Sequence, residues 1–171
     1  MPALLIAVPA LCFSALILTA AASDAVSFTI PNWISLALLA LFPVAAFAVG
    51  LSLPAAGLHL GLGFVLLVAG MVMFALRWMG GGDAKLIAVA GLWLGPAAMP
   101  GFLLGAALAG GLLAILLLSL RSASFRAVVA LGPRWVNRLA DPTEGIPYGV
   151  AIAVGVFSAL PASPFGAALG L

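Results

Sequence analysis

A run of 52 residues without Asp, Glu, Lys or Arg, residues 25–76, limits this chain more than any other feature of its sequence. A soluble domain must cover its surface with polar groups, and only 6% of these 171 residues are charged, against about 25% in an average soluble domain. The sequence therefore predicts that lipid surrounds the protein. Because backbone polar groups in lipid must be satisfied within the protein, and the apolar runs are long rather than alternating, we expect an all-α fold and not a barrel.

Charged residues and helix-breaking Pro and Gly divide the chain into segments near the roughly 20 residues that a membrane-spanning helix needs. We expect a bundle of about six transmembrane helices, closely packed because the chain has 20 glycines. The expected spans are residues 1–23, 31–51 and 58–78, a short span from 86 to the Gly95-Pro96 break, a span from Pro100-Gly101 to 120, and a last span over 146–170. The whole chain, 1–171, is then a single membrane-embedded domain with a loop at about 121–145, in which residues 125–139 are expected to form a surface amphipathic helix.

The basic residues support this topology. Six antiparallel spans place all six of them on one side of the membrane, and the opposite connections then carry only His59, which we expect in a loop. The six are Arg77, Lys85, Arg121, Arg126, Arg134 and Arg138. The positive-inside rule makes this side cytoplasmic and places both termini outside. We therefore expect a multi-pass protein of the inner (cytoplasmic) membrane.

The first apolar segment has an alternative interpretation as a cleaved signal peptide, because residues 20–23, Ala-Ala-Ala-Ser, resemble a cleavage site. However, no Lys or Arg precedes Arg77, so the basic region of a signal peptide is missing. We expect the segment to remain as the first span. No cluster of His, Cys and carboxylates has the spacing of metal ligands, so no metal or other cofactor is expected.

Two of the four acidic residues, Asp24 and Asp83, lie at the ends of expected spans on the same side. An ionisable group at the edge of hydrocarbon is costly and marks a candidate functional residue. Asp83 follows three glycines, 80–82, which allow close approach of backbone or of an extended substrate. If the two carboxylates meet, they share one proton. An aspartic protease needs this pair, since one carboxylate takes a proton from water while the protonated one polarises the scissile carbonyl.

Spacing alone leaves structural explanations open for these residues. Asp83 would cap a helix that begins at Ala84, and Asp24 would be a satisfied loop residue before Pro31. Lys85 would either balance the charge of the acid pair or extend to the lipid headgroups.

Three motifs, in family order, resemble those of the type IV prepilin peptidases. The segment 80–83, GGGD, with a basic residue two positions on, resembles the GxGD motif. Asp24, followed by IPN at 30–32, is similar to the first catalytic aspartate of that family and the segment after it. The segment 147–152, PYGVAI, resembles the closing PYGxAI element. The resemblance implies two catalytic residues, Asp24 and Asp83, and a supporting set of Gly80, Gly81, Gly82, Lys85, Pro31, Asn32, Pro147 and Tyr148.

The resemblance further implies cleavage of a short basic leader from prepilin precursors at the cytoplasmic membrane boundary. The chain lacks the cysteine-bearing segment and extra spans of larger members, so we expect no N-methyltransferase activity. Its size resembles the short Tad/Flp-pilus type or the archaeal preflagellin peptidases. Residues 25–29 lack the basic residues that many relatives carry there. The expected partners are the lipid bilayer, a prepilin precursor and, as a further candidate, the pilus-assembly machinery, with no nucleic acid.

Other functions fit the same two acids. A small transporter or ion-conducting subunit would use them as a relay, although both are expected at one surface and not at mid-membrane. A catalytically inactive pilus-assembly membrane protein would keep only the fold. A presenilin-like intramembrane protease would share the GxGD chemistry but not the other two motifs. Because residues 80–85 are rich in glycine, the two acids could lie apart before substrate binds.

Overall fold

The computed structural model describes residues 2–122 and 132–171, and all regular structure in these two ranges is helical. The elements in chain order are α1 (Pro2–Ser27), α2 (Asn32–Ala48), α3 (Leu53–Ala75), α4 (Gly81–Leu120), α6 (Arg134–Leu139), α7 (Tyr148–Ala159), the 3₁₀ helix η1 (Leu160–Ala162) and α8 (Pro164–Leu169). Within the described ranges, α1, α3 and α4 are long and apolar enough to cross a membrane, while α2 and the α7–η1 segment are shorter apolar helices. The predicted all-α membrane protein is confirmed.

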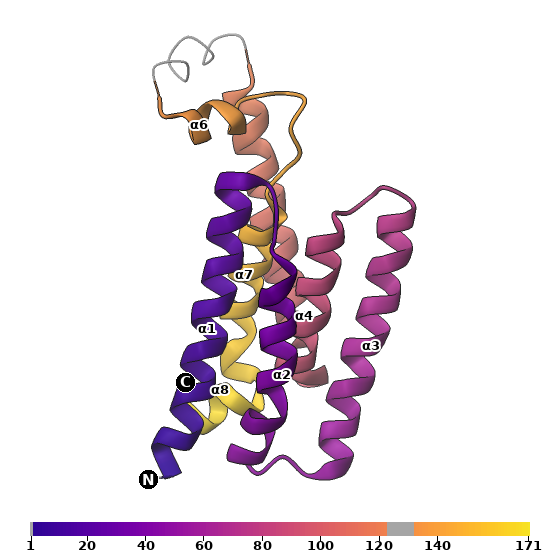
Figure 1. Ribbon diagram of the computed structural model, residues 1–171, viewed down its shortest axis with the longest axis vertical. Coiled ribbons are helices and arrows are strands. Elements are labelled where there is room, and N and C mark those ends of the chain that lie inside the picture. The colour runs from indigo at the N-terminus through magenta and orange to yellow at the C-terminus, as the bar shows by residue number, and fades with distance from the viewer. Residues whose placement is uncertain (1, 123–131) are drawn as a thin grey trace.

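Helix α4 consists of two arms that run in opposite directions (Figure 1). Gly95, at φ 74° and ψ 174°, leaves the helical conformation between them. A positive φ is costly for residues other than glycine, and Pro96 removes one intrahelical N–H. The first arm is antiparallel to α3, and the second arm is antiparallel to α7, as the close approach of Gly101 to Ala159 and of Gly110 to Tyr148 indicates. The predicted break between a short fourth span and a fifth span is therefore present.

The two ends of the bundle carry different connections (Figure 1). The end of α1, the start of α2, the α3–α4 connection and α6 lie at one end, which we call the site end. The α2–α3 connection, the reversal of α4 and both chain termini lie toward the other end. This is the alternation that the distribution of basic residues predicted.

Trp93, on the first arm of α4, joins four helices at the centre of the core. Its side chain is 1% exposed, stacks on Phe13 of α1 with ring centroids 4.5 Å apart, and lies 4.9 Å from the ring of Phe165 of α8. The indole Nε1–H donates to the Leu38 carbonyl of α2 over 3.0 Å. A buried indole needs such an acceptor, so this contact fixes α2 against α4.

His59 corrects one prediction, because it lies inside α3 and is buried rather than in a loop. The helix starts earlier than expected, since the hydroxyl of Ser52 caps it and a proline early in the first turn is tolerated. The ring Nδ1 donates to the Leu92 carbonyl over 2.7 Å. That carbonyl would normally accept from residue 96, but Pro96 has no N–H. His59 thus satisfies an acceptor that the reversal of α4 leaves free, at the end of the bundle away from the acids.

The expected surface helix falls partly outside the described residues, since positions 125–131 are not among them. The described remainder contains α6, Arg134–Leu139.

Candidate active site

Asp24 lies in the last turn of α1 and is only 6% exposed. It is therefore a buried helical residue and not the loop residue of the structural alternative. Its Oδ2 accepts a hydrogen bond of 2.7 Å from the backbone N–H of Gly149, the second residue of α7. Free N–H groups in the first turn of a helix, together with the helix dipole, form a favourable environment for a carboxylate.

The chain turns sharply after Asp24 and brings the IPN segment beside the start of α4. Phe28, at φ 55°, ends α1, and the Ser23 hydroxyl donates to the Thr29 carbonyl over 2.8 Å. Pro31 then forms the N-terminal boundary of α2. Between these points, Ile30 packs on Gly82: a Cβ added to Gly82 would lie 3.0 Å from the Cβ of Ile30. The second of the three motifs is thus in contact with the first.

Asp83 lies in the first turn of α4, which begins at Gly81 with Gly80 at the N-cap position. The expectation that Asp83 itself caps a helix starting at Ala84 is wrong. The Asp83 carboxylate instead lies against Gly80, near the N–H at the start of the helix, at the position of the acidic residue of a capping box. A Cβ at position 80 would lie 2.8 Å from Asp83 Oδ2, so a larger residue there would push the Asp83 carboxylate aside.

The two carboxylates lie together at the site end, close enough for the charge on Asp24 to act on Asp83. Asp83 Oδ1 is buried and has no hydrogen-bond partner among the described residues. Such an atom is uncommon in a folded protein, because leaving a buried acceptor unsatisfied costs about 1–3 kcal/mol. Two neighbouring acids, one held by a backbone N–H and one with a free oxygen, can bind and polarise a water molecule between them.

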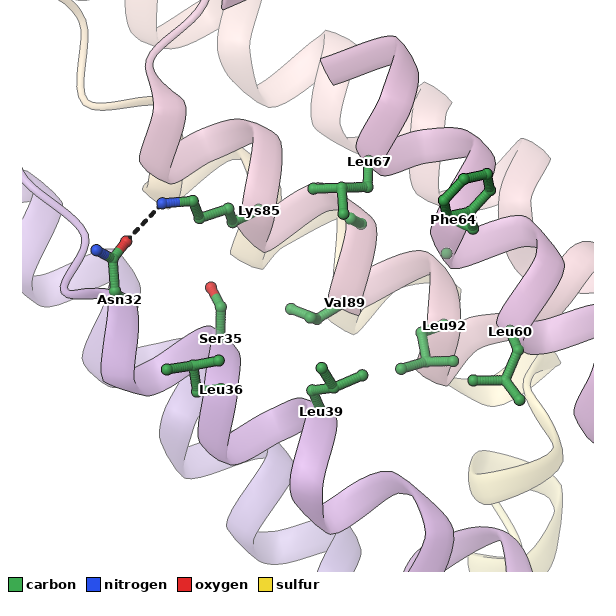
Figure 2. A pocket seen from close by; sticks show the side chains of 12 residues that line it. Asn32, Ser35, Leu36, Leu39, Leu60, Phe64, Leu67, Lys85, Val89 and Leu92 are labelled. Atoms are coloured by element: carbon green, nitrogen blue, oxygen red, sulfur yellow. Dashed lines mark hydrogen bonds between the residues drawn. The ribbon is translucent and has the colours of Figure 1, made fainter. Parts of the chain in front are cut away.

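Lys85 and Asn32, the polar residues of the supporting set, bind each other. Lys85 Nζ donates to Asn32 Oδ1 over 2.8 Å, which joins the start of α4 to the start of α2 (Figure 2). Lys85 was expected either to balance the charge of the acid pair or to extend to the lipid headgroups. Within residues 2–122, the structure shows no salt bridge between Lys85 and either aspartate.

The PYGVAI segment contributes mainly through its backbone. Pro147 is fully buried and forms the N-terminal boundary of α7. Tyr148 is 43% exposed, and its ring lies against Gly110 on the second arm of α4. The sequence reasoning did not select Gly149, although its position at the start of an expected span was a signal that it could donate a backbone hydrogen bond.

Helix α6 and the segment after it contact the end of α1 and the end of α4. Arg138 pairs with Glu144 at 2.8 Å, and its guanidinium carbon lies 5.2 Å from the centre of the Phe28 ring. Arg121 donates to the carbonyls of Leu139 and Gly145. These contacts fix the described part of the loop that leads into α7.

No three His, Cys, Asp or Glu side chains are grouped as metal ligands in the part of the chain that the structure describes.

Comparison with known proteins identifies the family. No curated protein and no solved structure gives a significant match. A model of the type IV leader peptidase family matches residues 11–115, which include both aspartates and the segments 30–32 and 80–83 and end before 147–152. This match covers more than half of the chain. The chain therefore belongs to the type IV leader peptidase family of membrane peptidases.

Proposed function

We propose that the protein is a membrane aspartic endopeptidase that removes the short basic leader from type IV prepilins of the Flp/Tad kind, with Asp24 and Asp83 as the catalytic pair. The observation that carries the proposal is that Asp24, in the last turn of α1, and Asp83, in the first turn of α4, lie near enough for their charges to interact. Spacing along the chain left open whether they meet. The family match adds the peptidase chemistry, and the substrate class comes from the resemblance of the motifs.

The surroundings of the two carboxylates suggest different roles. Asp24 accepts from the Gly149 N–H at the start of α7, which favours a carboxylate that takes a proton from water. Asp83 Oδ1 is buried without a partner, and a protonated acid at this atom can donate to the scissile carbonyl oxygen. The water oxygen then attacks the carbonyl carbon, and the proton taken by Asp24 passes to the leaving amine as the peptide bond breaks.

We place the site end at the cytoplasmic surface. The elements at this end contain Arg77, directly after α3, Lys85, in the first turns of α4, Arg121, at the end of α4, and Arg138, in α6. Cytoplasmic connections carry an excess of basic residues. A leader peptide at this surface would reach the acid pair while the apolar helix of the substrate remains in the bilayer. Both termini would then lie outside. We further propose that the protein acts as a peptidase without N-methyltransferase activity.

The test is to co-express a candidate Flp-type precursor with the protein and to follow its size on a gel. Asp24→Asn and Asp83→Asn, each alone, should abolish processing, because an amide cannot exchange the proton that the mechanism requires. Asp141→Asn is the matched control, since its side chain accepts from Thr143 in the loop, and processing should continue. Processing that survives both single substitutions would refute the proposal. Loss of proton flux across vesicles, with processing intact, would favour an aspartate relay.

A further inference from the structure

A groove of about 560 Å³ lies between α2 and α3, with the first arm of α4 as its floor (Figure 2). Its mouth is polar, with Asn32, Ser35 and Lys85. The rest of the lining is apolar and includes Leu39, Leu60, Phe64, Val89 and Leu92. The volume and the mixture of apolar walls with a few polar groups are those of a ligand site.

The groove belongs to a different face of α4 from the acid pair. Lys85, Val89 and Leu92 follow one another at the spacing of a single helix face and line the groove. Leu86 and Trp93 are buried in the core. The wall residue Phe64 is 66% exposed, so the groove opens toward the surrounding lipid.

Lys85 places a positive charge at the mouth without an anion beside it. Its Nζ donates to a neutral amide oxygen of Asn32. Across residues 2–122 and 132–171, the salt bridge that the structure contains is Arg138–Glu144, so Lys85 has no carboxylate at salt-bridge distance. An occupant that complements this groove is apolar along most of its length and negative at the site end.

We propose that the groove binds an anionic phospholipid, with one acyl chain along the apolar walls and the phosphate on Lys85 and Asn32. Basic pockets between transmembrane helices are known sites for anionic headgroups. A prepilin substrate fits the mouth less well, because the leader proposed above is basic and would meet the positive charge of Lys85. A lipid complements both parts of the groove, since its phosphate is negative and its flexible acyl chain can adapt to the apolar walls.

The experiment uses the full-length protein in phosphatidylcholine vesicles that contain a phosphatidylglycerol with a diazirine in its acyl chain. After illumination, mass spectrometry should find the label on residues 32–39, 60–67 and 85–92. Lys85→Gln should lower this labelling about fivefold, the effect of one basic residue near an anionic lipid. Lys85→Arg should retain it, and Arg77→Gln is the control for loss of a charge elsewhere at the same end, with no effect on labelling expected.

A second pair of variants tests the acyl chain without touching the charge. Leu39→Trp should fill the groove and lower labelling, whereas Val44→Trp, on an exposed part of α2 outside the groove, should not. The proposal is overturned if the label spreads evenly over all lipid-facing helices, if Lys85→Gln labels like the wild type, or if unlabelled phosphatidylcholine displaces the label as well as phosphatidylglycerol does. Displacement by a prepilin precursor but not by phosphatidylglycerol would assign the groove to the substrate. Because binding is measured, the outcome does not depend on the proposed cleavage.

Discussion

Replacing Gly149 with alanine tests directly how Asp24 is held. An added Cβ would lie 2.9 Å from the Cβ of Asp24 and 3.0 Å from its Oδ2, distances at which one of the two groups must move. Rotation of the carboxylate can relieve the contact with Oδ2, but the Cβ of Asp24 is fixed to its backbone, so the end of α1 and the start of α7 must also move apart. The 2.7 Å hydrogen bond from the Gly149 N–H would then be lost.

The size of the effect follows from that bond. A hydrogen bond to a charged group contributes about 1.5–3 kcal/mol, which corresponds to roughly a 10- to 150-fold fall in rate if the whole contribution is made in the transition state. A displacement of about 1 Å in a catalytic group has a similar cost, on the order of 100-fold. We therefore expect kcat for precursor cleavage to fall by one to two orders of magnitude. KM should stay unchanged, because Gly149 acts through Asp24 and is not assigned a substrate contact.

Cleavage of a fluorescent precursor peptide in vesicles gives both constants, and thermal unfolding in detergent shows that the variant is folded. Gly111→Ala is the matched control, because nothing lies within 4 Å of the Cβ position at this helical glycine, and its kinetics should equal those of the wild type. A folded Gly149→Ala protein that cleaves at the wild-type rate would refute the positioning role of this hydrogen bond.

Three further predictions concern the free energy of unfolding and are checked by unfolding in detergent. Gly70→Ala should lower the free energy of unfolding by about 1–3 kcal/mol through overpacking, because its Cβ would lie 3.1 Å from the Cα of Ala84. Gly61→Ala, where the space is open, should instead raise it by up to about 1 kcal/mol through helix propensity. Trp93→Ala should cost about 3–5 kcal/mol, since it empties the centre of the core.

The helical segments were the predictable part of this protein, whereas the sequence left open whether the two acids lie close together. Long apolar runs have few folding options in lipid, so length and charge alone locate the spans. The reversal of α4 could be predicted because it depends on two adjacent residues. Gly95 adopts a positive φ, and Pro96 lacks a backbone N–H. The order of the motifs implied Asp24 and Asp83 as a pair, but not whether the two side chains are close before substrate binds.

The sequence does not predict which residues from distant helices contact one another, because helix packing decides these contacts. His59 was assigned to a loop because a lone polar residue in an apolar stretch has no visible partner, and the Leu92 carbonyl that it satisfies is distant in the chain. Gly149 was overlooked for the same reason, since its role depends on α1 and α7 lying antiparallel. The groove at Lys85 depends on α2 and α3 both packing on α4 while remaining apart from each other.

The acid pair is held by backbone where a soluble enzyme would use polar side chains. The last turn of α1 and the first turns of α4 and α7 converge at the site end, and each carboxylate lies beside an N–H of a helix start, that of Gly149 or that of Gly80. A bundle that is 66% hydrophobic has few polar side chains to supply, but every helix start has free N–H groups. At both positions an added Cβ would lie within 3 Å of the acid that it faces. Glycine at 80 and 149 therefore leaves each carboxylate in place beside its N–H, whereas a side chain there would displace it.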